Sequence, residues 1–168
     1  NKIETPKPTP DAEALLENFD AKLEEMTQSF SVTAEDGGTI KAEEGTIIRF
    51  FPGAFKTLNG DPVTGPVDIE VIEIYEKADM LLSRMATNGK TENGEIATLI
   101  SGGEFYVNAT QDGHQLALAT GFQLAAPVDN TGGADNEMAL FTIEECIGEA
   151  DCDDVWVQDK EGRVGIGK

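Results

Sequence analysis

Two cysteines near the end of the chain are the first residues whose type and spacing favour a specific chemistry. Cys146 and Cys152 lie in the acidic stretch IEECIGEADCDD. A cysteine pair this close in sequence can close a small loop disulfide, which would indicate an oxidising compartment. Two unpaired thiols are the alternative. A zinc site is disfavoured because structural zinc takes four ligands, and His114 is the only histidine that could add an imidazole.

The same stretch concentrates carboxylates, and calcium is the cation that prefers six to eight oxygen ligands. The candidate calcium ligands are Glu149, Asp151, Asp153 and Asp154. The spacing of an EF-hand is not met, because the sixth position counted from Asp151 is Trp156 where an EF-hand has glycine. A solvated acidic loop is therefore the favoured interpretation, with calcium as the one candidate cofactor.

The residue pattern does not favour catalysis. His114 lies in the turn sequence DGH, where an exposed side chain is expected, and the chain lacks GxSxG, HExxH and GxGxxG. A pair of carboxylates could still hydrolyse a glycan, but a chain with 32 acidic residues supplies such pairs by chance. We therefore predict that the protein is not an enzyme, and we keep glycan hydrolysis as an alternative.

Length and charge limit the partners. The chain has 168 residues and a formal net charge of −20, so nucleic acid and anionic lipid surfaces would be repelled by most of its surface. A chain of this length can bury a sizeable core. No run of about 18 apolar residues occurs, so no membrane span is predicted.

The first thirty residues predict a tether followed by a helix. Residues 1–10 contain three prolines, which favours an extended segment. Residues 11–29 are expected to form an amphipathic helix, because apolar residues recur there at steps of three and four. Those residues are Ala12, Leu15, Leu16, Phe19, Leu23 and Met26.

From residue 30 to residue 168 the apolar residues mostly alternate, as in β-strands that bury one face. Seven or more short strands with turn dipeptides between them predict a mainly β fold, an antiparallel β-sandwich. Within it we expect one short helix at 77–85. After Val71 we expect a β-bulge or a strand bend, because the apolar positions shift there from odd to even residue numbers. Hairpin turns are predicted at Asp36-Gly37-Gly38 and Asp112-Gly113, and an exposed turn at Asn88-Gly89 and Asn93-Gly94.

Four sequence elements resemble the β-sandwich domain shared by zonula occludens proteins, netrin receptors and ankyrins. They are GGTI at Gly37–Ile40, GT-I at Gly45–Ile47, PGAF at Pro52–Phe55 and GPVDIEVIEIY at Gly65–Tyr75. The later segments EKADMLL, SGGEFYVNAT and LFT are similar to exported lipoproteins of Gram-negative bacteria. Some eukaryotic relatives cleave themselves at a His-Phe-Ser site, but here Gln115 and Leu116 follow His114, so that activity is not carried over.

The resemblance implies an exported protein at the cell surface or in the periplasm, anchored to the outer membrane by a lipid attached upstream of Asn1. Together with the residue pattern, it leads us to expect a non-catalytic binding or structural module whose partner is a protein or a glycan. A subunit of a structural assembly is the second alternative, beside glycan hydrolysis.

Overall fold

The computed structural model describes residues 12–76, 79–80, 88–91, 93–133, 135, 137–143, 156–159 and 161–165. The predicted mainly β class is confirmed, since the described residues form twelve strands and one helix. The helix α1 spans Ala12–Met26. The strands are β1 (Gln28–Thr33), β2 (Gly38–Lys41), β3 (Ile47–Phe50), β4 (Phe55–Thr57), β5 (Pro66–Ile74), β6 (Asn88–Lys90), β7 (Ile96–Thr98), β8 (Glu104–Gln111), β9 (His114–Leu118), β10 (Gln123–Ala125), β11 (Phe141–Ile143) and β12 (Trp156–Gln158).

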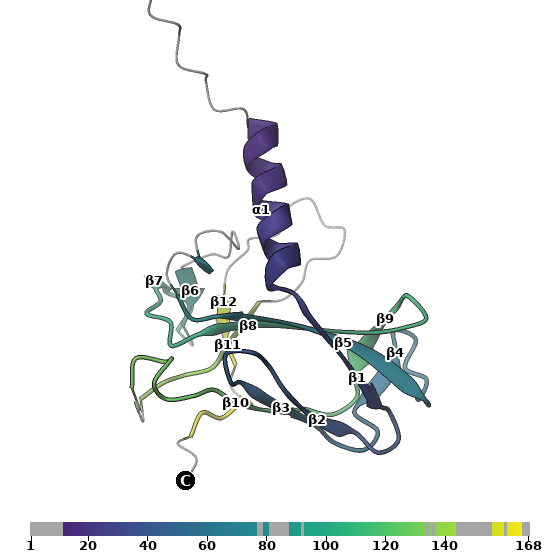
Figure 1. Cartoon of the computed structure of the whole chain (residues 1–168). Coiled ribbons are helices and arrows are strands. Elements are labelled where there is room, and N and C mark those ends of the chain that lie inside the picture. Colours follow the sequence, from purple (N-terminus) through teal and green to yellow (C-terminus); the bar gives the residue numbers. More distant parts are fainter. Residues whose placement is uncertain are drawn as a thin grey trace, which may run out of the picture.

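These strands form three sheets. The five-stranded sheet has the order β1-β5-β8-β9-β4, the three-stranded sheet β10-β3-β2, and the four-stranded sheet β11-β12-β6-β7. Neighbouring strands pair antiparallel, as predicted, with one exception in the four-stranded sheet, where β12 and β6 run parallel. The five-stranded sheet lies above the three-stranded sheet in Figure 1, and α1 projects from the side of β5 that faces away from it.

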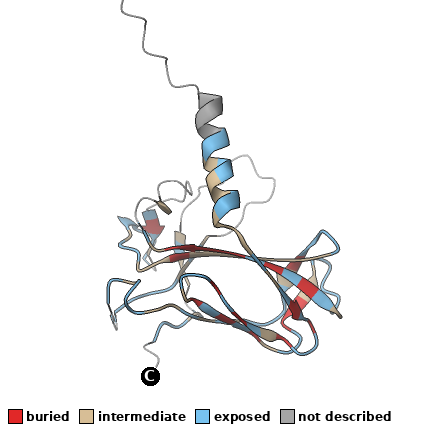
Figure 2. Cartoon of the chain, in the orientation of Figure 1, coloured by how far each residue is buried: buried red, intermediate tan, exposed pale blue. Residues whose placement is uncertain are grey.

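One apolar cluster joins the five-stranded and three-stranded sheets. Alternation along β5 points Val67, Ile69 and Val71 into it, and β3 contributes Ile48 and Phe50 from below. Figure 2 shows these buried positions along both sheets. The ring of Phe50 lies 5.1 Å from that of Phe55 and 5.7 Å from that of Phe122, distances at which aromatic pairs attract.

The turn at Asp36-Gly37-Gly38 forms, but it does not join two strands of one sheet as predicted. The amide of Gly37 donates to the carbonyl of Thr33 at 2.8 Å, and these two residues form an isolated bridge. Beyond this bridge β1 pairs with β5, whereas β2 pairs with β3. The chain therefore crosses from one sheet to the other at this turn.

The predicted bulge after Val71 is wrong. The register of β5 with β8 runs without interruption from Asp68↔Thr110 to Ile74↔Glu104. The apolar residues stop alternating because the end of β5 is covered on both faces. The four residues from Val71 to Ile74 are accordingly all buried. The helix α1 contacts β5.

The hairpin around Asp112-Gly113 is confirmed. Gln111 pairs with His114, and both turn residues have positive φ, 50° at Asp112 and 77° at Gly113. Two residues of positive φ match the right-handed twist of the flanking strands. His114 is exposed beside this turn, as expected.

Other boundaries differ from the prediction. Strand β1 begins at Gln28, inside the segment 11–29 that the sequence assigned to the helix. Asn88-Gly89, predicted in an exposed turn, lies in β6, where Gly89 is buried, while Asn93-Gly94 does form the turn to β7. The tether at 1–10 and most of the predicted helix at 77–85 lie outside the described residues.

The helix of the described chain is neither long nor apolar enough to cross a membrane.

Candidate functional site

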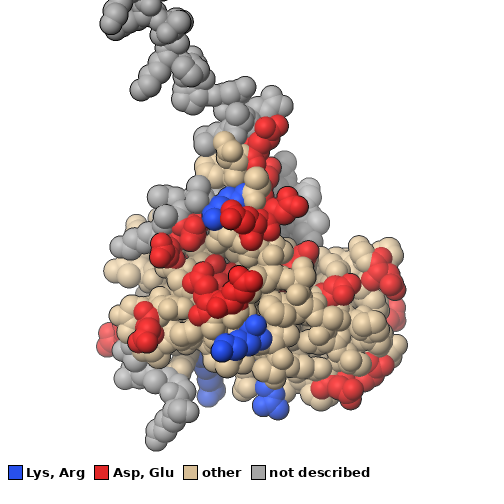
Figure 3. Space-filling view, in the orientation of Figure 1, with Lys and Arg blue, Asp and Glu red and all other residues tan. Residues whose placement is uncertain are grey.

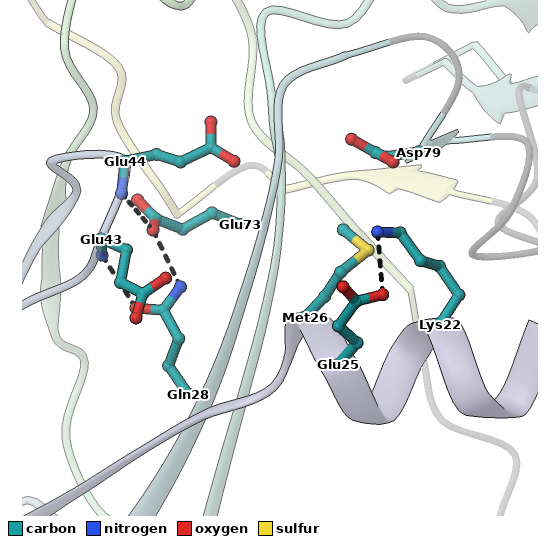
Figure 4. Close-up of a pocket in the computed structure, with 8 residues that line it drawn as sticks. All are labelled: Lys22, Glu25, Met26, Gln28, Glu43, Glu44, Glu73 and Asp79. Carbon is teal, nitrogen blue, oxygen red and sulfur yellow. Dashed lines mark hydrogen bonds and ion pairs between the residues drawn. The ribbon is translucent and has the colours of Figure 1, made fainter.

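An acidic pocket of about 210 Å³ opens beside the end of β5. The last turn of α1, the start of β1, the loop between β2 and β3, and Asp79 surround it (Figure 4). The lining residues are Lys22, Glu25, Met26, Gln28, Glu43, Glu44, Glu73 and Asp79.

Glu73 is the buried carboxylate of this pocket, with 2% of its surface exposed. Every second side chain of β5, at Val67, Ile69 and Val71, points into the core, and Glu73 is the next residue in this series. Its Oε2 accepts hydrogen bonds from Nε2 of Gln28 at 3.0 Å and from the amide of Glu44 at 2.9 Å. Its Oε1 accepts one from the amide of Thr46 at 3.0 Å. Both oxygens are therefore engaged in holding the loop between β2 and β3.

Two further contacts complete this attachment. Oε1 of Gln28 accepts a hydrogen bond from the amide of Glu43 at 2.8 Å. The hydroxyl of Thr46, a fully buried residue, lies 2.6 Å from the hydroxyl of Tyr75, and the ring of Tyr75 stands edge-on against that of Phe105. The amides of Glu43, Glu44 and Thr46 thereby donate to side chains of the five-stranded sheet, while the amide of Gly45 donates to the carbonyl of Ala42.

The carboxylates of the pocket titrate differently. Burial pushes the pKa of Glu73 upward, but hydrogen bonds from Thr46, Gln28 and the amide of Glu44 outweigh it and leave that pKa below its ordinary value. Burial, followed by the negative charges of Glu73, Asp79 and Glu76, raises the pKa of Glu44. Lys22 also lines the pocket, and its amine pairs with Glu25 at 3.2 Å.

A second buried carboxyl lies outside the pocket. Glu104, the first residue of β8, is paired in register with Ile74 and has 8% of its surface exposed. Its Oε2 has no hydrogen-bond partner, and burial raises its pKa. Glu104 and Glu73 are thus buried glutamates of adjacent strands in opposite environments.

The sequence-predicted site residues and the residues that line the pocket are different residues. Cys146 and Cys152, and the candidate calcium ligands Glu149, Asp151, Asp153 and Asp154, lie outside the described residues. Among the residues that are described, no group of three or more His, Cys, Asp or Glu side chains is placed to hold a metal ion.

Glu73 is not among the sequence-predicted site residues, although the sequence carries a signal for it. In VDIEVIEI the inward positions Val67, Ile69 and Val71 are followed at the same parity by a glutamate. A charged residue at an inward position predicts a buried, hydrogen-bonded carboxylate. Its donors could not be identified in the same way, because Thr46 is 27 positions away.

Comparisons of this chain with protein-family models, with curated proteins and with solved structures find no match.

Proposed function

We propose that this protein is a non-catalytic binding or structural module, in which two packed β-sheets form a β-sandwich that carries a recognition surface. In this proposal the protein is exported and tethered at the cell surface through its proline-rich first ten residues. The resemblance of Gly65–Tyr75 and the neighbouring elements to sandwich domains, and to exported lipoproteins, supports this reading.

The observation that carries the proposal is the engagement of Glu73. A catalytic carboxylate must present an oxygen to substrate, either to attack it or to transfer a proton. Both oxygens of Glu73 instead accept hydrogen bonds from Gln28, Glu44 and Thr46. These bonds fix a loop of one sheet to a strand of the other, so the best-defined polar site of the described chain has an architectural role.

Glycan hydrolysis is the second candidate, and one observation favours it. Retaining and inverting glycosidases use two carboxyl groups whose environments push their pKa values apart. Glu44 and Glu73 show such a divergence, with the pKa raised in the first and lowered in the second.

Hydrolysis assays on the full chain distinguish the two candidates. The wild type and the variant Glu44→Gln are incubated with a panel of neutral and acidic polysaccharides, and the reducing ends released are counted. We expect both proteins to match a heat-inactivated control. Release of reducing ends by the wild type that is lost in folded Glu44→Gln would replace the proposal with the hydrolase.

A further inference from the structure

The outer face of the three-stranded sheet carries two exposed cations and no acidic residue. Strands β2, β3 and β10 read GTIK, IIRF and QLA. Ile40, Ile48 and Phe50 point into the core and are buried. The alternation therefore leaves Lys41 and Arg49 on the opposite face, both exposed.

The register places these cations among polar and apolar neighbours. Arg49 pairs with Thr39 on one side and with Gln123 on the other. The adjacent row consists of Lys41, Ile47 and Ala125. Lys41 and Arg49 are thus diagonal neighbours on two paired strands. The α-carbons of such neighbours lie about 7–8 Å apart, and two positively charged side chains in this arrangement repel each other.

Neither cation is neutralised by the described part of the chain. Lys22 pairs with Glu25, but Lys41 and Arg49 form no ion pair with a described carboxylate. The guanidinium carbon of Arg49 lies 5.5 Å from the ring centre of Phe51, a cation–π contact that orients the guanidinium. In a chain with 32 acidic and 12 basic residues, two adjacent cations that pair with no described carboxylate indicate a surface for an anionic group.

We propose that this face binds a carboxylated polysaccharide, an inference that rests on the proposed binding function and names its ligand class. A guanidinium holds a carboxylate with two parallel hydrogen bonds, and Lys41 adds a second positive charge. Thr39 and Gln123, one on each side of Arg49, can hydrogen-bond sugar hydroxyls. Ile47, 42% exposed, offers apolar surface to the C–H groups of a sugar ring.

The position of the face suits an extended anionic chain. It lies on the side of the molecule opposite α1 (Figure 1). Figure 3 shows acidic side chains around the base of α1, while both basic and acidic side chains lie lower on the molecule, the acidic ones toward its right edge. Negative charges that lie farther than about 8 Å from the face are largely screened at physiological salt.

Binding of alginate oligosaccharides to the full chain tests the proposal by calorimetry, with neutral dextran and poly-L-glutamate as comparison ligands. The variants are Arg49→Gln and Lys41→Gln, and the matched control is Lys90→Gln, which removes an exposed lysine from β6. We expect alginate to bind and dextran not to bind. Affinity should fall about tenfold or more in Arg49→Gln, several-fold in Lys41→Gln and not at all in Lys90→Gln.

Melting curves first establish that each variant is folded. Absence of alginate binding, an equal loss in Lys90→Gln, or equal binding of poly-L-glutamate would each overturn the proposal. Self-association of the wild type that disappears in Arg49→Gln would overturn it as well, by assigning the face to a second copy. Cleavage of alginate by the wild type would instead refute the proposed non-catalytic function, whichever surface holds the ligand.

Discussion

Glu73 and Glu104 show, at the scale of single residues, that burial alone does not decide what a carboxyl group contributes. Glu73 receives hydrogen bonds from Gln28 and from the amides of Glu44 and Thr46. Oε2 of Glu104 receives none. A hydrogen bond to a charged group stabilises a fold by roughly 1.5–3 kcal/mol, whereas a buried charged group without a partner costs about that much or more. The same substitution should therefore have opposite effects at the two positions.

Glu73→Gln should destabilise the protein. Glutamine has one acceptor oxygen, so at least one donor to Oε1 or Oε2 loses its partner, and we expect a loss of about 2 kcal/mol, or roughly 4–8 °C in Tm. Because the folded-state pKa of Glu73 lies below its ordinary value of 4.5, the wild type should hold this advantage at neutral pH and lose it as the pH falls below about 4.5. Thermal melting of both proteins between pH 7 and pH 3 measures the difference, and a gap that widens in acid would contradict it.

Glu104→Gln should stabilise the protein at neutral pH. The substitution removes a buried charge while keeping the shape of the side chain, and we expect a gain of about 1 kcal/mol. The folded-state pKa of Glu104 is raised, so the wild type binds a proton more readily when folded and recovers stability as the pH falls. The advantage of Glu104→Gln should accordingly shrink in acid. A lower Tm for Glu104→Gln at pH 7 would show that Glu104 has a stabilising role.

At the scale of elements, the turn at Asp36-Gly37-Gly38 determines how the two sheets are connected. Gly37 has a φ of +70°, which glycine adopts without strain. A β-carbon there would overlap the carbonyl oxygen of Phe50 and lie 2.7 Å from the carbonyl carbon of Phe51. The turn thus packs directly against the end of β3.

Gly37→Ala should therefore lower the free energy of unfolding more than the same substitution at another glycine with a similar positive φ. Gly53 is the matched control, because its φ is +69° and nothing lies within 4 Å of an added β-carbon. We expect Gly53→Ala to lower the free energy of unfolding by about 1 kcal/mol, because alanine is strained at a positive φ. Gly37→Ala should lower it by about 2 kcal/mol more, because the added β-carbon also overlaps the backbone of Phe50. Urea denaturation measures the free energy of unfolding of both variants. Equal losses would contradict the prediction and show that the backbone at Phe50 moves to accommodate the added β-carbon at little cost.

The elements also show which features the sequence could predict. Alternation indicated strands that bury one face, as β5 does with Val67, Ile69 and Val71, and Asp112-Gly113 identified the β8–β9 hairpin, because both signals are local. The sequence could not show that β1 and β2 separate into different sheets, since strand partners depend on contacts far apart in the chain. For the same reason, the glutamate at 73 was visible as an anomaly on its strand while its donors at Gln28 and Thr46 were not.

At the scale of the whole molecule, the net charge of −20 should weaken the fold at low ionic strength. Part of this repulsion is concentrated at the pocket, where Glu73, Asp79 and Glu76 add to burial in raising the pKa of Glu44. Salt shortens the range of such interactions from about 30 Å at 0.01 M to about 10 Å at 0.1 M. We therefore expect Tm to rise by several degrees between 10 and 300 mM NaCl.

The variant Glu44→Gln tests how far the pocket contributes to this salt dependence. Its control is Asp68→Asn, which removes one exposed negative charge from the far end of β5. At 10 mM NaCl we expect Glu44→Gln to melt at a higher temperature than the wild type and to gain less from added salt, because the local repulsion is already relieved. Asp68→Asn should change both quantities less. Equal effects of the two substitutions would assign the repulsion to the overall charge, and the acids around Glu73 would then carry no particular electrostatic strain.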